Sequence, residues 1–403
     1  MRKLAILNTH PIQYFAPLYR RLAQEPDLDV TVYYCSRQGA EEYFDEGFKR
    51  SVKWDVPLTD GYRAEFLPNL RSRGRVAGFW SLINPGIISE LRRHSYDALM
   101  VGGHNHATYV IGMLAARVLG IPVLMRCDTH LLLHRSRLKR ALRKPIMGFL
   151  YNHICSVCLA IGTRNREFYQ YHNVPEERVK LVPFSVDNSS FIAAAEAITD
   201  RSAVRRKLGL PVGKPLILFA SKLTARKRPM DLISAFNRIS QQGIEAALAF
   251  VGSGELEPTL REYAARHKLE DVYFFGFQNQ SELPNFYAAA ELFVFPSENE
   301  PWGLVLNEVM CAGLPVVVTK EIGAVPDLVV NGSNGFLFDV GDVDQLAEHL
   351  LVLLRSPELR QKMGRESLRM IKTWDYDSCV KGIKQVLDRT TIRELRPAQH
   401  ELT

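Results

Sequence analysis

The sequence predicts an α/β protein made of two Rossmann-like, doubly wound domains that face a central cleft, and three observations lead to this prediction. The chain has 403 residues, a length that suits two or three domains. Short apolar runs, typical of parallel strands buried on both faces, alternate with helical patterns. This alternation occurs twice, with a change of composition between the two halves. In such sheets ligands bind beyond the carboxyl ends of the strands, so the loops after strands are where a site is expected.

The first domain is expected to cover residues 1–187. Its expected strands are residues 3–7, 30–34, 98–101, 123–126, 154–161 and 179–183. A helical pattern over residues 109–119 ends at Gly120, because glycine commonly follows a helix.

The second domain is expected to cover residues 211–373, after a linker at residues 188–210 where the composition changes. Its expected strands are residues 216–220, 246–251, 272–275, 292–295, 316–318 and 336–338. Each of these runs is followed by turn residues and a helical pattern, so the second half repeats the organisation of the first.

Composition and charge exclude several classes of protein. Hydrophobic residues make up 46% and charged residues 24% of the chain, which excludes a disordered or fibrous protein. Lysine and arginine number 51 against 44 acidic residues, which gives a formal charge of +7. This mildly basic balance favours an anionic ligand or membrane face, and it is too small to indicate a nucleic-acid partner.

The cysteines and the apolar segments indicate the compartment. The chain is too long to need disulfides, so its scattered cysteines favour a reducing compartment, the cytoplasm. Cys155 and Cys158 form a CxxC in an apolar segment; buried cysteines are favoured there over a zinc or redox site. Residues 145–163 carry no charge, but Asn152 and His153 in their middle favour a helix end and a strand over a membrane span.

Residues 135–144 form a basic segment in which leucines interleave with positive charges. No acidic residue occurs between Thr129 and Arg166. The basic residues of the segment are Arg135, Arg137, Lys139, Arg140, Arg143 and Lys144. The pattern predicts an amphipathic helix, and two interpretations stay open: a solvated helix face, or a patch that binds an anionic membrane surface peripherally.

The motif EPWGLVLNE, residues 300–308, follows a strand and leads into a helix. The amide groups at the start of that helix suit a phosphate. Glu300 precedes the helix and Glu308 lies about one turn inside it, where carboxylates accept hydrogen bonds from sugar hydroxyls. Alternatively, Glu300 only complements the helix dipole.

The motif SKLTARKRP, residues 221–229, follows the first strand of the second half. Lys222 and Lys227 in this loop suit a diphosphate, although basic loop residues are often only solvated. The motif VGSGE, residues 251–255, lacks the third glycine of the dinucleotide fingerprint, which argues against a nicotinamide dehydrogenase.

Taken in order, these motifs resemble the family-4 retaining glycosyltransferases of the GT-B fold (glycosyltransferase group 1 type). The resemblance covers about residues 214–354 and includes SKLTARKRP, VGSGE, VYFFGFQNQSELPNFYAAAELFVFPS, EPWGLVLNE, CAGLPVVVT and GAVPDLVVNGSNGFLF. It implies transfer of a sugar from a nucleotide-sugar to a hydroxyl acceptor with retention of configuration, and neither a metal nor another cofactor is expected. The acceptor class that the resemblance implies is a lipid-linked or growing glycan in bacterial polysaccharide or glycolipid synthesis.

The resemblance also implies roles for individual residues. Glu300 contacts the hydroxyls of the donor sugar, and Glu308 holds the nucleotide ribose. Lys222, at a position where the family most often has arginine, and Lys227 neutralise the donor diphosphate. The backbone amides that complete this cradle belong to Trp302, Gly303 and Leu304.

The first half matches the family less closely. The loop at residues 8–15 replaces a glycine-rich family loop, so His10 and Gln13 are candidates for the cleft; a structural turn is the alternative. GGHNH resembles the end of the family strand with a catalytic-site histidine, and His104 is the first choice and His106 the second. Both are alternatively loop histidines with backbone partners.

Two further positions depend on the resemblance. Asp128 occupies a position where relatives often have histidine, so it is a candidate of undefined role. The final segment, residues 374–403, is expected to cross back onto the first domain. Two rival functions stay open: a nucleotide-sugar epimerase of the same fold, and a non-catalytic glycan-binding protein.

Overall fold

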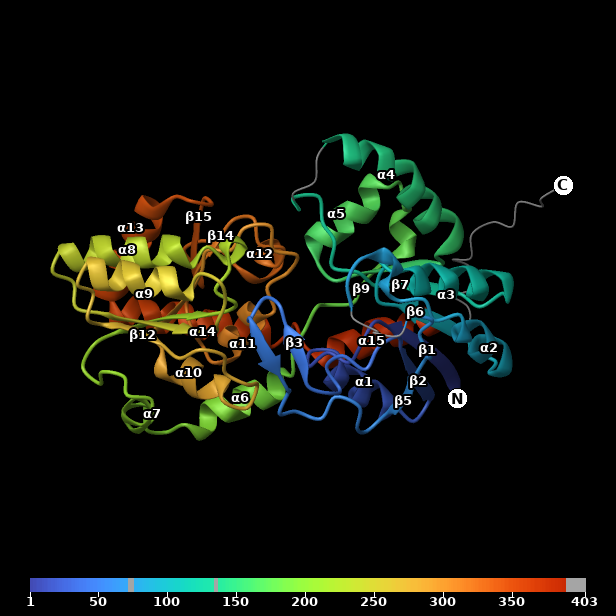
Figure 1. Cartoon of the computed structure of the whole chain (residues 1–403), viewed down its shortest axis with the longest axis horizontal. Coiled ribbons are helices and arrows are strands. Elements are labelled where there is room, and N and C mark those ends of the chain that lie inside the picture. The colour runs from blue at the N-terminus through green and yellow to red at the C-terminus, as the bar shows by residue number, and fades with distance from the viewer. Residues whose placement is uncertain (72–75, 134–136, 389–403) are drawn as a thin grey trace. The chain divides into compact units, whose positions relative to one another are not determined.

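The computed structural model describes residues 1–71, 76–133 and 137–388 of the chain. Contacts divide these residues into two units, each with its own large sheet. The first unit comprises Met1–Tyr43, Val56–Ser185 and the described residues from Asp375 onward; the second comprises Phe44–Asp55 and Val186–Trp374. Figure 1 labels most of the helices and strands and colours the chain from blue to red along the sequence.

The first unit is built on a parallel sheet, in which the described residues form seven strands in the order β5-β2-β1-β6-β7-β8-β9. The order reverses between β1 and β6, which is the topological switch point of a doubly wound sheet. The strands are β1 Arg2–Asn8, β2 Leu28–Tyr34, β5 Arg63–Phe66, β6 Ala98–Val101, β7 Val123–Met125, β8 Val157–Ala160 and β9 Val179–Leu181.

Successive strand residues point to opposite sides of this sheet, and helices bury the side chains on both sides. Ala5 and Leu7 pack in one core with α2, α3 and α5, and Leu4 and Ile6 pack in the other with α1 and α15. The helices are α1 Ala16–Ala23, α2 Gly86–Arg93, α3 Ala107–Val118, α4 Arg137–Phe149, α5 Thr163–Tyr171 and α15 Tyr376–Leu387, with the short turns η1 Phe79–Ser81, η2 Leu150–Ile154 and η3 Glu176–Arg178.

The second unit repeats this architecture with a parallel sheet, in which the described residues form six strands in the order β12-β11-β10-β13-β14-β15. Here the order reverses between β10 and β13. The strands are β10 Leu216–Ala220, β11 Ala247–Val251, β12 Val272–Phe274, β13 Leu292–Phe295, β14 Val316–Thr319 and β15 Gly335–Phe338. A hairpin of β3 Tyr43–Asp45 and β4 Arg50–Val52 lies apart from this sheet.

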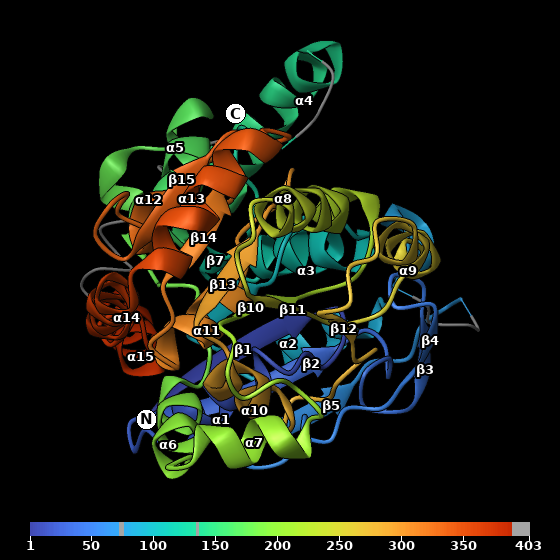
Figure 2. The same ribbon diagram turned by 90° about the vertical axis from the view of Figure 1, so that its left-hand side faces the viewer.

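Helices also bury the sheet of the second unit. Ile217 and Phe219 of β10 share a core with α8, α9 and α13, and Figure 2 shows α8 and α13 side by side. The helices are α6 Asn188–Ala197, α7 Arg201–Lys207, α8 Pro229–Gln241, α9 Glu257–Arg266, α10 Leu283–Ala289, α11 Val305–Cys311, α12 Val325–Leu328, α13 Val343–Arg355 and α14 Pro357–Ile371, with the turn η4 Ala225–Lys227.

The predicted fold class is confirmed, since both sheets are parallel, Rossmann-like and doubly wound. Every strand expected from an apolar run is present, with ends shifted by a few residues. The largest shift is at residues 154–161, because η2 extends to Ile154 and β8 begins only at Val157. Strands β3, β4 and β5 were not expected, since half-exposed side chains interrupt their apolar pattern.

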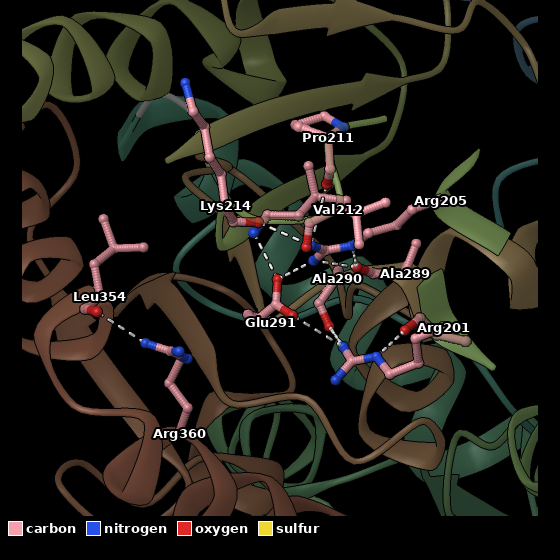
Figure 3. Close-up of polar contacts among 12 residues, drawn as sticks. Arg201, Arg205, Pro211, Val212, Lys214, Ala289, Ala290, Glu291, Leu354 and Arg360 are labelled. Carbon is pink, nitrogen blue, oxygen red and sulfur yellow. Dashed lines mark hydrogen bonds and ion pairs between the residues drawn. The ribbon is translucent and has the colours of Figure 1, made fainter. Parts of the chain in front are cut away.

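Residues 188–210, predicted to be a linker, instead form α6 and α7 of the second unit. Arg205 of α7 is buried and donates hydrogen bonds to the carbonyl oxygens of Ala289, at 2.7 and 2.9 Å, and of Lys214, at 2.8 Å (Figure 3). It also pairs with Glu291, whose carboxylate accepts the amide of Leu216. These contacts fix α7 to the start of β10 and β13, which explains why the segment is not a free connection.

The second unit differs from the predicted domain in one further respect, because it includes Phe44–Asp55, which was assigned to the first domain. Within the predicted crossover segment, residues 374–403, helix α15 packs against α1 in the first unit. Residues 389–403 of that segment lie outside the described residues.

The uncharged segment at residues 145–163 contains a helix end, a π-helical turn and a strand. Cys155 and Cys158 are buried in the core of the first unit, and burial raises the pKa of the Cys155 thiol to about 12. Nowhere in the described part of the chain is a helix long and apolar enough to cross a membrane.

Candidate functional site

In the second unit, two loops meet where the strand order reverses. β10 and β13 are neighbouring parallel strands, so the loops that follow them leave the same edge of the sheet. Residues 221–228 after β10 carry Lys222 and Lys227, and residues 296–304 after β13 carry Glu300. The topology therefore brings these predicted residues to one place.

Glu300 lies between the buried ammonium of Lys227 and the exposed guanidinium of Arg226. Its Oε2 atom accepts hydrogen bonds from Arg226 Nη1, at 2.9 Å, and Ser297 Oγ, at 3.1 Å, and it pairs with the ammonium of Lys227. Glu300 and Lys227 are only 7% and 8% exposed. Lys227 Nζ also lies 4.7 Å from the ring centre of Phe295, so the loop after β10 is fastened to the end of β13.

Burial and pairing act in opposite directions on these charges. Burial opposes ionisation of Glu300, but the positive charges of Lys227 and Arg226 outweigh it and lower the pKa of this carboxyl. Burial lowers the pKa of the Lys227 ammonium, which Glu300 opposes and nearby Lys222 reinforces. The result is a carboxylate surrounded by cations, which suits a ligand that carries both hydroxyl groups and negative charge.

Lys222 occupies the edge of the same loop and is partly exposed. Its Nζ atom lies 2.8 Å from Asp45 Oδ1 and 3.0 Å from Asp45 Oδ2. It also lies 4.6 Å from the ring centre of Phe48. Both partners belong to the segment Phe44–Asp55, so a residue predicted to bind a diphosphate is paired with a carboxylate of the chain itself.

Glu308 is almost completely buried in α11, where two side chains hold its carboxylate. The hydroxyl of Tyr287 donates to Oε2, and Gln280 Nε2 donates to Oε1 at 3.4 Å. Since α11 begins at Val305, Glu308 lies one turn inside the helix, as the sequence predicts. Its carboxylate is thus fixed in one orientation before any ligand arrives.

Trp302, Gly303 and Leu304 form the passage from Glu300 into α11. Trp302 Nε1 donates to Asn307 Oδ1 at 3.0 Å. Gly303 has a φ of +92°, and a Cβ atom there would lie 3.0 Å from the ring of Phe295, so this position requires glycine. The backbone of these residues leads into the amino end of α11, and phosphate binding by their amides stays a prediction.

The VGSGE motif supports the loop of Lys222. The amide of Leu223 donates to the carbonyl oxygen of Ser253 at 3.0 Å, and the amide of Leu256 donates to that of Leu223 at 2.9 Å. The motif therefore fixes the backbone beside Lys222, which is a structural reason for its place in the sequence.

The first unit has an equivalent pair of loops at its own switch point. β1 and β6 are parallel neighbours, and the loops after them carry His10 and Gln13, and His104 and His106, respectively. His10 Nδ1 lies 2.9 Å from Thr9 Oγ1. Burial, with a smaller effect of His106, lowers the pKa of His10 to about 4, so its imidazole is neutral at pH 7.

The remaining candidates of the first unit differ in burial. His104 is buried, with Nδ1 at 3.2 Å from the hydroxyl of Tyr151. His106 is buried at the start of α3, and burial lowers its pKa. Gln13 is partly exposed and Asp128, after β7, is exposed. The roles of all these side chains stay predictions.

Four side chains that hold the predicted glutamates were not predicted, and one of them is Gln280, which donates to Glu308. Arg226 and Ser297 contact Glu300, and Tyr287 contacts Glu308. Arg226 lies within the basic loop, and its charge was the only signal available. Ser297 and Tyr287 contribute single hydroxyl groups, and their residue types and spacing carry no signal of their own.

Residues 137–144 of the predicted basic segment are part of helix α4, which has exposed apolar side chains. Leu138, Leu142, Ile146 and Phe149 are 70%, 65%, 63% and 60% exposed. Their spacing of three or four residues places them along one stripe of the helix. Lys139 and Arg143 on the same helix are exposed as well, while Arg135 lies outside the described residues.

A family model described as glycosyl transferases group 1 matches residues 200–370. This range contains both loops of the site in the second unit and both glutamates. The segments that carry the sequence resemblance lie within it.

Curated relatives match longer parts of the chain at modest identity. The sulfoquinovosyl transferase of Arabidopsis thaliana is 28% identical over 310 residues, which are 75% of this chain and 58% of that protein. A GDP-mannose-dependent phosphatidylinositol monomannoside mannosyltransferase of Corynebacterium glutamicum is 31% identical over 214 residues, 51% of this chain and 55% of that protein. The chain thus spans little more than half the length of these two relatives.

Solved structures match almost the whole chain. Anabaena HepE, in complex with UDP and glucose, has a TM-score of 0.70 and 20% identity over 96% of this chain and 100% of that chain. WaaG, a glycosyltransferase involved in lipopolysaccharide biosynthesis, has a TM-score of 0.67 and 17% identity over 96% of this chain and 100% of that chain. At such identities the likeness shows a shared fold. The chain therefore has the GT-B fold of two Rossmann-like domains, and its residues 200–370 match the model of the glycosyl transferases group 1 family.

Proposed function

We propose that this protein is a retaining glycosyltransferase that moves a sugar from a nucleotide-sugar to a hydroxyl group of an acceptor. The observation that carries the proposal is the cluster of Lys227, Arg226 and Glu300 at the switch point between β10 and β13. The family match over residues 200–370 and the UDP and glucose of the HepE complex support a nucleotide-sugar as the donor class.

In this proposal each predicted residue of the second unit binds one part of the donor. Lys222 and Lys227 neutralise the diphosphate together with amides at the start of α11. Glu300 accepts hydrogen bonds from the sugar, and Glu308 accepts them from the ribose. The surroundings of the two glutamates fit this division, because cations surround Glu300 whereas Tyr287 and Gln280 hold Glu308.

The reaction proceeds by electrostatic stabilisation of the leaving group. As the sugar–phosphate bond breaks, negative charge develops on the diphosphate, and the ammonium groups of Lys222 and Lys227 stabilise it. The departing phosphate accepts the proton of the acceptor hydroxyl, which attacks from the same face of the sugar and retains its configuration. In this scheme lysine charges perform the neutralisation, so no metal ion is required.

The acceptor is a lipid-linked or growing glycan in bacterial polysaccharide or glycolipid synthesis, reached at the cytoplasmic face of the membrane. Helix α4 supports peripheral contact, because its exposed apolar stripe has basic neighbours such as Lys139 and Arg143. Basic residues near an anionic leaflet contribute about 1 kcal/mol each to binding. The first unit supplies the acceptor side, with His104 as its catalytic-site histidine.

A panel of nucleotide-sugars tests the proposal. Thermal unfolding is measured with UDP-glucose, UDP-N-acetylglucosamine, GDP-mannose and ADP-glucose, because a ligand that binds only the folded state raises the melting temperature. At least one of them is expected to stabilise the protein and to be consumed when a membrane extract supplies acceptors. A donor that is converted without an acceptor indicates an epimerase instead, and no stabilisation by any nucleotide-sugar contradicts the proposal.

A further inference from the structure

A short segment from the amino-terminal part of the sequence forms part of the second unit. Residues Phe44–Asp55 include β4 and all of β3 except Tyr43, two strands that Figure 2 labels, and they follow β2 of the first unit in the sequence. Their side chains and backbone contact the loops after β10, β11 and β12. These loops leave the carboxyl edge of the sheet, where the ligand of a doubly wound domain binds.

The contact with the loop after β10 is an ion pair on the proposed diphosphate lysine. Both carboxylate oxygens of Asp45 lie within 2.8 and 3.0 Å of Lys222 Nζ, and the ring of Phe48 covers that ammonium at 4.6 Å. Lys222 also passes so close to Gly47 that a Cβ atom there would lie 2.6 Å from Lys222 Cδ. The hairpin thus packs along the length of the Lys222 side chain.

The contacts with the other two loops anchor the segment. Ser253 Oγ donates to the carbonyl oxygen of Phe48 at 3.1 Å, and Asn279 Nδ2 donates to that of Lys53 at 2.7 Å. The amide of Ser281 donates to Asp55 Oδ2 at 3.3 Å, and the rings of Phe48 and Phe277 are 4.8 Å apart. The segment is therefore held at both ends, and Asp45 is not a mobile surface charge.

Asp45 is itself a well-supported carboxylate. Burial acts to raise its pKa, but the ammonium of Lys222 and the amides of Phe48 and Gly47 outweigh burial and lower it. Its side chain is 13% exposed, against 35% for Lys222. At neutral pH the Asp45 carboxylate is therefore ionised. It pairs with the Lys222 ammonium, the group proposed to bind the diphosphate of the donor.

We propose that Asp45 competes with the diphosphate of the donor for Lys222, so that this hairpin sets the affinity of the donor site. The inference rests on the proposed function, because it needs Lys222 to bind the donor. A diphosphate oxygen that reaches Lys222 either replaces Asp45 or remains beside its negative charge, and both weaken binding. Asp45 weakens binding only of ligands whose phosphates reach Lys222, so the affinity for a nucleoside without phosphates does not depend on Asp45.

The test is calorimetric titration of wild type and Asp45→Asn with UDP, and with GDP and ADP in parallel. Asparagine can still accept the amides of Gly47 and Phe48 through its Oδ1 atom, so the turn is kept. The expected result is diphosphate binding that is about fivefold tighter, the factor for one partly exposed ion pair. Binding of uridine is expected to be the same in both proteins.

Glu46→Gln is the matched control, because it removes the same charge from the adjacent residue, whose carboxylate pairs with Lys49 at 3.4 Å. Asp45→Ala is measured beside Asp45→Asn, and thermal unfolding verifies that each variant folds. Unchanged or weaker diphosphate binding in both Asp45 variants overturns the inference. Equal tightening by Glu46→Gln also overturns it, because the effect would then be general to the charge of the hairpin.

Lys222→Ala separates this inference from the proposed function on which it rests. The expected result is weaker UDP binding and no further effect of Asp45→Asn in the double variant. If Lys222→Ala weakens UDP binding but loss of the Asp45 charge does not tighten it, only the inference fails. If Lys222→Ala leaves UDP affinity unchanged, or the wild type binds none of the three nucleotides, the assignment of Lys222 fails and the inference fails with it.

Discussion

The two glutamates of the EPWGLVLNE motif are both buried but have different partners, and this predicts different effects of the same substitution. Glu300→Gln removes the charge that Lys227 and Arg226 surround, so turnover is expected to fall about a hundredfold while nucleoside diphosphate affinity changes little. Glu308→Gln is expected to weaken nucleoside diphosphate binding about tenfold, because its proposed partner is the ribose. Initial rates and calorimetric dissociation constants measure both effects.

An identical pattern in the two variants would refute this division of roles. Because Glu300→Gln leaves the Lys227 ammonium buried without a carboxylate, its unfolding free energy is expected to fall by about 3 kcal/mol. Denaturant unfolding therefore accompanies the kinetics, so that a loss of turnover is not confused with a loss of folded protein.

His10 predicts a dependence of stability on pH. Its pKa is lowered from 6.5 to about 4 in the folded protein, so the unfolded chain binds more protons between these values. The stabilisation is present above pH 6.5 and is lost as the pH falls toward 4, with a slope of up to about 1.4 kcal/mol per pH unit. His10→Asn is expected to reduce this slope in urea unfolding measured from pH 7 to pH 4. The same slope in both proteins would contradict the assignment.

The candidate site could be predicted where a motif places charge next to a strand end. Lys222, Lys227 and Glu300 were named as candidates in this way, because the loops after parallel strands converge whatever their sequence separation, and Glu308 was named from its place in the same motif as Glu300. Asp45 was not found, since it lies 177 residues from Lys222 and no rule of spacing connects them. Contacts of this kind depend on how a loop is folded, which a local pattern does not encode.

At the scale of single elements, helix α4 predicts binding to membranes. Its stripe of Leu138, Leu142, Ile146 and Phe149 is exposed next to basic side chains, so the protein is expected to sediment with anionic vesicles and not with neutral ones. The bound fraction is expected to fall as salt rises, because the Debye length shrinks.

A pair of matched variants distinguishes membrane binding through α4 from nonspecific binding through exposed apolar residues elsewhere. Leu142→Ser is expected to reduce sedimentation, whereas Leu114→Ser, at an exposed leucine of α3, is expected to leave it unchanged. Protein that stays in the supernatant with anionic vesicles at low salt would favour the other interpretation of the segment, a solvated helix face.

Strands could be predicted where an apolar run in the local sequence shows that the segment is buried. The runs at β6 and β10 are apolar at every position and fully buried, so their strands were predicted with little error. The hairpin β3–β4 has mostly exposed or half-exposed side chains and was missed. Helix α7 was read as a linker because its attachment depends on Arg205 and the carbonyl of Ala289, 84 residues away.

At the scale of the whole molecule, the chain repeats one construction principle in two units. Each unit has a parallel sheet whose strand order reverses at one point, between β1 and β6 in the first unit and between β10 and β13 in the second. In both units, the loops after these two strands carry candidate residues. Figure 2 labels β1, β10 and β13, and its colours run from blue in β1 to yellow-green in β10 and orange in β13, which shows how far apart in the sequence the loops of the two units are. The family match lies in the second unit, so the claim that can be tested most directly concerns the donor site.

The most direct test of that claim is calorimetric titration of wild type and Lys227→Ala with the nucleoside diphosphate that binds best. The ammonium of Lys227 is buried between Glu300 and the ring of Phe295, where a charged contact to phosphate is worth about 1.5–3 kcal/mol. The account predicts a loss of affinity of that size in a variant that still unfolds cooperatively. Unchanged affinity in folded Lys227→Ala would contradict a diphosphate site between β10 and β13.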